Sequence, residues 1–90
     1  MNFNDMNITI VGLGMEGGSY AIAINHYIKP KNLFAIDINE NILIAAEKLG
    51  VIQKGSTDPK DILPQSDLVI MCIYPSDIIS FIKIHMPLFK

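Results

Sequence analysis

The apolar residues of the chain fall in short blocks, and polar or glycine-rich stretches separate one block from the next. Runs of neighbouring apolar residues predict strands that are buried on both sides, whereas apolar residues three or four positions apart predict helices. The two patterns alternate along the sequence. They predict strands over 7–12, 33–37, near 52–54 and over 68–73, and helices over 15–28, 40–49 and 76–84.

The residues between these blocks carry the usual signals for helix ends. The stretch 29–32 contains a proline among polar residues, which ends the first helix. Asn39 is placed to cap the second helix, and Gly50 fits the position just after its end. Residues 55–59 predict a loop, and residues 60–63 predict a single helical turn before Pro64. The residues predicted to face the sheet are Met15, Ala21, Ile22, Ile24 and Ile28 in the first helix and Ile42, Leu43, Ala46 and Leu49 in the second.

Strands that alternate with helices predict an α/β fold, with a parallel sheet and helices on both of its faces. At 90 residues the chain is long enough for one small domain. Ligands of such open sheets bind at the carboxyl ends of the strands. Three loops are expected at that edge, over residues 12–17, 37–39 and 73–77.

A full G-x-G-x-x-G motif follows the first predicted strand and opens the first predicted helix. Its glycines are Gly12, Gly14 and Gly17. The first allows a sharp turn, the second lets a pyrophosphate approach the backbone, and the third lets the helix pack closely on the strand. The helix N-terminus offers backbone N–H groups to phosphates. This order of strand, glycine turn and helix predicts a Rossmann-type dinucleotide-binding domain over residues 1–90.

An acidic residue at the end of the second strand strengthens this prediction. Asp37 closes the apolar run 33–36 and lies about twenty residues after the last glycine of the motif. Its carboxylate is suited to accept hydrogen bonds from ribose hydroxyls and to repel a 2′-phosphate. No Lys or Arg follows at positions 38 and 39, so NAD is favoured over NADP. The alternative interpretation of Asp37 is a residue that only caps a helix.

The remaining predicted cofactor contacts are Met15, Glu16, Ile38, Ile73, Tyr74 and Pro75. Tyr74 and Pro75 are expected to line the wall near a ribose. Pro75 has a second interpretation, an ordinary proline in the first turn of a helix. Glu16 would place a negative charge near the pyrophosphate, and the interpretation we favour is that its side chain points to solvent.

Composition narrows the range of functions. The net charge is −2 and no arginine is present, so the sequence gives no basic surface for nucleic acid. The single cysteine, Cys72, excludes an internal disulfide and is expected to be a buried apolar residue. His26 and His85 have no partners at metal-ligand spacing, so no metal site and no catalytic residue are predicted. No apolar run is long enough for a membrane helix, and a cytoplasmic setting is expected.

Several segments resemble the amino-terminal half of prephenate dehydrogenase and the related arogenate dehydrogenase. They are ITIVGLGMEGGSYAIAI at 8–24, FAIDIN at 34–39, AAEKLGVI at 45–52 and SDLVIMCIYPSDII at 66–79. The resemblance implies NAD as cofactor and an oxidative decarboxylation of prephenate to 4-hydroxyphenylpyruvate in tyrosine biosynthesis. It also implies that NAD is contacted by Gly12, Gly14, Met15, Glu16, Asp37 and the loop 73–75. Glu16 stands where the family usually has an apolar residue.

Family members continue into a helical dimerisation domain and a region that supplies a catalytic histidine and substrate-binding arginines. The 90 residues are therefore expected to be a truncated cofactor half that is inactive alone and that forms homo-oligomers. Two alternatives remain open at this stage. One is a stand-alone NAD-binding module, and the other is the cofactor half of a different reductase, such as a pyrroline-carboxylate or imino reductase.

Overall fold

Four parallel strands form the centre of the structure, a computed structural model that describes residues 2–90 apart from the side chain of Met15. The strands are β1 (Asn7–Val11), β2 (Asn32–Ile36), β3 (Lys54–Ser56) and β4 (Leu68–Met71). Their spatial order is β3-β2-β1-β4, and every neighbouring pair is parallel. The chain therefore starts in the middle of the sheet, extends to one side with β2 and β3, and returns to the other side with β4. The predicted α/β class is confirmed.

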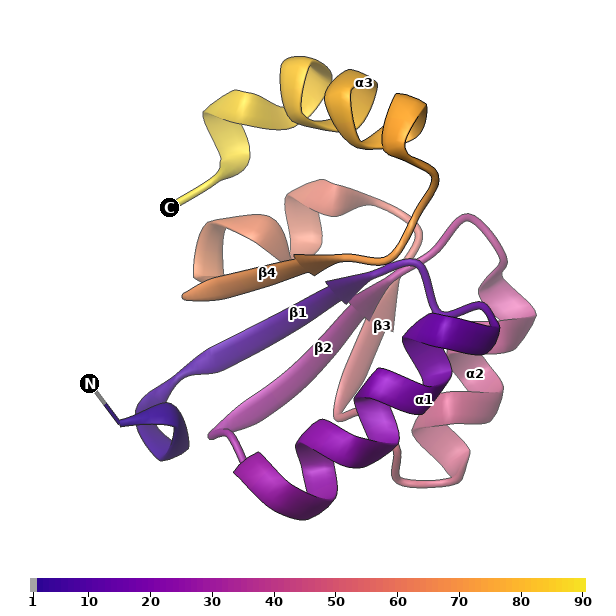
Figure 1. The fold of residues 1–90 in the computed structure, drawn as a ribbon, viewed down its shortest axis with the longest axis vertical. Coiled ribbons are helices and arrows are strands. Elements are labelled where there is room, and N and C mark those ends of the chain that lie inside the picture. The colour runs from indigo at the N-terminus through magenta and orange to yellow at the C-terminus, as the bar shows by residue number, and fades with distance from the viewer. Residues whose placement is uncertain (1) are drawn as a thin grey trace.

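Helices cover both faces of the sheet (Figure 1). One face carries α1 (Met15–Ala23) and α2 (Glu40–Lys48), and the other carries α3 (Pro75–His85). A π-helical turn, Ile24–Ile28, extends α1, and Lys29 follows it in the left-handed conformation, with φ of 52°. Short 3-10 segments complete the structure at Phe3–Asp5, Pro59–Asp61, Leu63–Gln65 and Met86–Leu88.

The strands divide their side chains between two cores, because successive residues of a strand point to opposite faces. Ile8, Ile10, Leu33 and Ala35 pack under α1 and α2. Val11, Phe34 and Ile36 pack on the opposite face. They meet Ile62 and Leu63, which lie between and at the start of two 3-10 segments, and Phe81 from α3. A buried hydrogen bond of 2.6 Å joins the Thr9 and Ser66 hydroxyls, which satisfies both polar groups.

The third strand lies two residues later than the sequence predicted. We expected it near 52–54 and a loop from 55, but β3 is Lys54–Ser56. Ile52 is instead buried between the sheet and α2, and a side chain at position 55 would collide with Leu43, 2.8 Å from its Cβ position. Packing under α2 therefore selects a glycine for the strand, against the general β-preference of apolar residues.

Two predicted helix faces are each wrong at one residue. Ala21 and Ile24 are buried as predicted, but Ile22 is exposed. In α2, Leu43 is buried, whereas Leu49 is 79% exposed because the helix has ended and the chain turns away through Gly50, with φ of 74°. The predicted cap is confirmed, because the Asn39 side chain accepts hydrogen bonds from the N–H groups of Asn41 and Ile42.

The last strand is shorter and more exposed than predicted. We expected 68–73 to be covered on both faces, but β4 ends at Met71 and all four of its residues are at least partly exposed. Its position explains the difference, since β4 pairs with β1 on one side and forms the edge of the sheet on the other. The predicted single turn at 60–63 is instead two 3-10 segments, with Pro64 inside the second.

The helices within residues 2–90 are each too short or too polar to cross a lipid bilayer.

Candidate functional site

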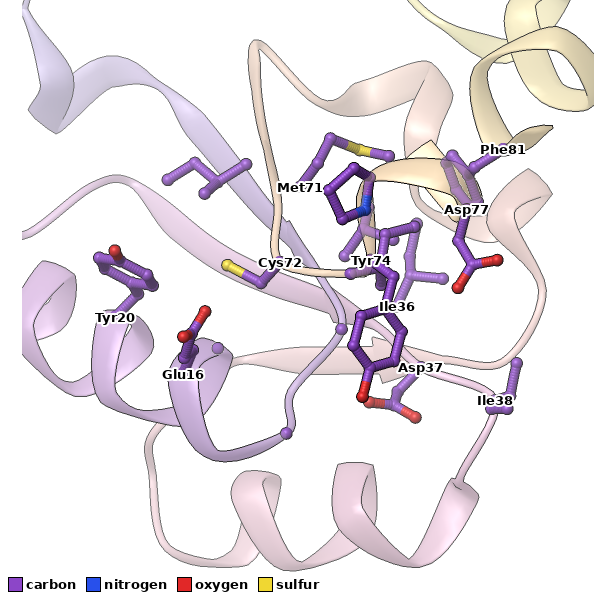
Figure 2. A pocket seen from close by; sticks show the side chains of 17 residues that line it. Glu16, Tyr20, Ile36, Asp37, Ile38, Met71, Cys72, Tyr74, Asp77 and Phe81 are labelled. Atoms are coloured by element: carbon purple, nitrogen blue, oxygen red, sulfur yellow. The ribbon is translucent and has the colours of Figure 1, made fainter. Parts of the chain in front are cut away.

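A broad open hollow lies at the carboxyl ends of β1, β2 and β4 (Figure 2). The three loops that follow these strands meet there, because parallel strands all end at the same edge of the sheet. Its volume is about 1140 Å³, which is large for a small-molecule site. The lining residues are Val11, Gly12, Gly14, Glu16, Gly17, Tyr20, Ile36, Asp37, Ile38, Ile70, Met71, Cys72, Ile73, Tyr74, Pro75, Asp77 and Phe81.

The glycine turn forms one wall of the hollow, and its glycines differ in what surrounds them. Gly12 has a φ of 94°, a conformation that side chains disfavour. At Gly17 an added Cβ would lie 1.8 Å from the Gly12 carbonyl oxygen, so α1 packs directly on the turn. Gly14 is open, because an added Cβ would have no heavy atom within 4 Å. Gly14 therefore presents bare backbone to the hollow at the start of α1.

Asp37 connects the end of β2 to this turn. One carboxylate oxygen accepts a hydrogen bond from the Leu13 N–H at 2.8 Å, and the other accepts from the Asn39 N–H at 2.8 Å. The Gly12 N–H also donates to the Ile36 carbonyl at 2.8 Å. The turn is therefore held by two bonds from the end of β2. Each carboxylate oxygen has a further lone pair that can accept from a ligand.

The segment after β4 forms the opposite wall. Ile73 packs into the second core, and Tyr74 is the residue before α3, with its side chain 79% exposed. Pro75 occupies the first turn of α3, where its missing N–H costs no helical hydrogen bond. Pro75 thus fits the ordinary structural interpretation, and it lines the hollow as well.

Glu16 lies in the first turn of α1, and its side chain is exposed as predicted, yet it also lines the hollow. Figure 2 shows it beside Cys72 and Tyr20, away from Asp37. Burial raises the pKa of the Cys72 thiol above its ordinary value, and the charge of Glu16 adds to the rise. The prediction that Cys72 is buried is wrong. It is only partly buried because it follows the edge strand and faces the hollow.

Nine of the ten predicted cofactor contacts line this hollow, and the side chain of the tenth, Met15, lies outside the described part of the structure. The other lining residues were not predicted as cofactor contacts, and they include Tyr20, Asp77 and Phe81. Tyr20 lies one helical turn beyond Glu16, a spacing that could have revealed it. Asp77 and Phe81 belong to α3, whose path over the hollow depends on the tertiary structure.

Within residues 2–90, no group of three or more His, Cys, Asp or Glu side chains is placed to hold a metal ion.

Comparison with known proteins gives one significant match among curated sequences. It is a prephenate dehydrogenase of Bacillus subtilis (strain 168), 44% identical over 52 residues. The chain is similar to part of a prephenate dehydrogenase. The matched region covers 58% of the chain but 14% of that enzyme. No family model matches the chain.

Solved structures agree with this similarity. A prephenate dehydrogenase from A. aeolicus, in complex with hydroxyphenyl propionate and NAD+, superposes with a TM-score of 0.84 at 25% identity. That match covers 94% of this chain and 30% of the enzyme. An apo scyllo-inositol dehydrogenase from Lactobacillus casei shares the fold, with a TM-score of 0.74 at 22% identity. The chain thus spans less than a third of these proteins.

Proposed function

We propose that the hollow binds NAD and that the chain is the cofactor-binding part of a prephenate dehydrogenase. The observation that carries this proposal is the meeting of the open glycine turn, the start of α1 and Asp37 around one hollow. The likeness to prephenate dehydrogenases, one of them solved with NAD+, supports it. When bound, NAD supplies a hydride acceptor, and the residues of this chain hold and orient it.

The residues present fit a dinucleotide. The bare backbone at Gly14 leaves room for a pyrophosphate, which a side chain there would occupy. The N-terminus of α1 offers the partial positive charge that phosphates prefer. Gly12, Met15, Glu16 and Gly17 complete this turn, and Ile38, Ile73, Tyr74 and Pro75 form the surrounding walls.

Asp37 would select NAD over NADP. Its carboxylate is fixed by the Leu13 and Asn39 N–H groups, so it cannot easily move away from a ligand. Ribose hydroxyls can donate to it, whereas a 2′-phosphate would be repelled. Among the described residues that line the hollow there is no lysine, arginine or histidine to offset that repulsion.

We propose that residues 1–90 act as the dinucleotide-binding domain of a cytoplasmic dehydrogenase that converts prephenate to 4-hydroxyphenylpyruvate, and that copies of the chain associate. Cofactor binding is the step assigned to the hollow, since its lining has no cationic side chain to hold the two carboxylates of prephenate.

Titration calorimetry with NAD+ tests the cofactor site. We expect Gly14→Val to abolish binding, because the new side chain would fill the space of the pyrophosphate. The fold should survive, since an added Cβ at position 14 would have no heavy atom within 4 Å and φ there is negative, at −59°. Circular dichroism checks the fold.

Gly18→Ala is the matched control. Gly18 does not line the hollow, and an added Cβ would meet only the Leu13 carbonyl oxygen at 3.7 Å, an ordinary contact. This variant should bind NAD+ as the unmodified chain does. A folded Gly14→Val variant with unchanged affinity would mean that the phosphate turn is wrongly assigned.

A further inference from the structure

The charged side chains that line the described part of the hollow are all acidic. Three of its lining residues, Glu16, Asp37 and Asp77, carry carboxylates, and none is a lysine, arginine or histidine. An anionic ligand held there relies on backbone N–H groups and on the start of α1 for attraction. Each carboxylate therefore attracts or repels the part of the ligand nearest to it, depending on the charge of that part.

The carboxylates lie at different places around the hollow. Asp37 lies near Ile38 and below Tyr74, whereas Glu16 lies on the other side, beside Cys72 and Tyr20 (Figure 2). Because Glu16 lies beside Cys72, its charge faces the end of β4, which agrees with a pKa of the Cys72 thiol raised by burial and then by Glu16. Glu16 is thus exposed to solvent and still influences the hollow on this side.

A dinucleotide with its adenosine ribose at Asp37 and its pyrophosphate at the glycine turn would extend its other half towards Glu16. That half carries the nicotinamide ring, which has a positive charge when oxidised and none when reduced. A carboxylate attracts the oxidised ring and offers nothing comparable to the reduced one.

We propose that Glu16 is a specificity-determining residue that favours the oxidised dinucleotide over the reduced one. This inference rests on the proposed function. Single charges roughly 4 to 8 Å apart in a water-like medium interact strongly enough to change affinity about two- to sixfold. In a dehydrogenase this preference would help the oxidised cofactor to bind and the reduced cofactor to leave.

The test compares dissociation constants for NAD+ and NADH, measured on the 90-residue chain by calorimetry at low salt. The informative quantity is the ratio of the NADH constant to the NAD+ constant, because general changes in fold affect both constants alike. We expect Glu16→Gln to lower this ratio about two- to sixfold. About 1 M NaCl should lower the ratio of the unmodified chain in the same direction, since salt screens an exposed charge.

Asp77→Asn is the matched control, because Asp77 also lines the hollow but lies on the Asp37 side in Figure 2. It should leave the ratio unchanged. An unchanged ratio in Glu16→Gln, or an equal fall in Asp77→Asn, would overturn the inference while NAD binding stands. If neither dinucleotide binds the unmodified chain, the proposed function fails and the inference fails with it.

A second measurement needs no dinucleotide. Only the thiolate of Cys72 reacts with iodoacetamide, so the rate at a fixed, mildly alkaline pH follows its pKa. Glu16→Gln removes one cause of the raised pKa, and alkylation should become faster. An unchanged rate would show that the charge of Glu16 does not reach this side of the hollow, which would also overturn the inference.

Discussion

Gly17 and Gly18 are neighbours in α1, but only position 18 has room for a side chain. A Cβ at position 17 would lie 1.8 Å from a backbone oxygen, whereas one at position 18 would meet no atom closer than 3.7 Å. We expect Gly17→Ala to destabilise the fold by about 1–3 kcal/mol or more, since the helix must move off the turn. Gly18→Ala should stabilise it by up to about 1 kcal/mol through helix propensity.

Thermal unfolding followed by circular dichroism measures both effects. The two variants add the same methyl group to the same helix, so their difference isolates the contact with Gly12. A Gly17→Ala variant that melts at or above the temperature of the unmodified chain would contradict the packing described for the turn.

Single residues also show what the sequence could reveal. The spacing of the glycines and Asp37 predicted which loops meet, because the motif requires a fixed strand, turn and helix order. It did not reveal that Asp37 accepts a hydrogen bond from the Leu13 N–H. That bond depends on how the loops after β1 and β2 pack against each other. The ribose contact of Asp37 stays a prediction. Asp37 accepts the Asn39 N–H near the start of α2 and also lines the hollow.

At the scale of elements, β4 is an edge strand whose four residues are all at least partly exposed. It has an unpaired edge, carries no charge or proline, and is apolar at all four positions. Such an edge favours pairing with another chain. We therefore expect concentration-dependent self-association, and we expect Leu68→Lys to weaken it because a charged edge resists pairing. Leu68 is already 37% exposed, so lysine can reach solvent.

Sedimentation velocity over a range of concentrations checks this expectation. Leu49→Lys is the control, because Leu49 is exposed at the end of α2 and is not part of the edge strand. If the control dissociates the assembly as strongly as Leu68→Lys, the interface lies elsewhere. A monomer at all concentrations would contradict self-association.

The sequence predicted the order and type of the elements better than their edges. Short blocks of mainly apolar residues made β1 and β2 clear. The position of β3 was wrong because Leu43 of α2 packs on it and leaves no room for a side chain at position 55. The run at 68–73 suggested a central strand, and only the sheet order shows that β4 lies at the edge. Strand order is set by long-range packing, which local patterns do not encode.

For the whole molecule, we expect cofactor binding without turnover of prephenate. The sequence has no arginine to grip two carboxylates. His26 lies in the π-helical turn after α1 and His85 at the end of α3, and neither lines the hollow. An assay of NADH production with purified chain and prephenate measures this directly. Turnover above background, in material free of the host enzyme, would reveal a catalytic site elsewhere in these residues.

We propose above all that the hollow binds NAD and that Asp37 makes it prefer NAD over NADP. The most direct test of this proposal is calorimetric titration of the unmodified chain and of Asp37→Ala with NAD+ and NADP+. We expect the unmodified chain to bind NAD+ more tightly, and Asp37→Ala to reduce the ratio of the two affinities. The ratio isolates the 2′-phosphate, because loss of the bond to Leu13 weakens both ligands alike. Equal affinities for NAD+ and NADP+ in the unmodified chain would contradict the account.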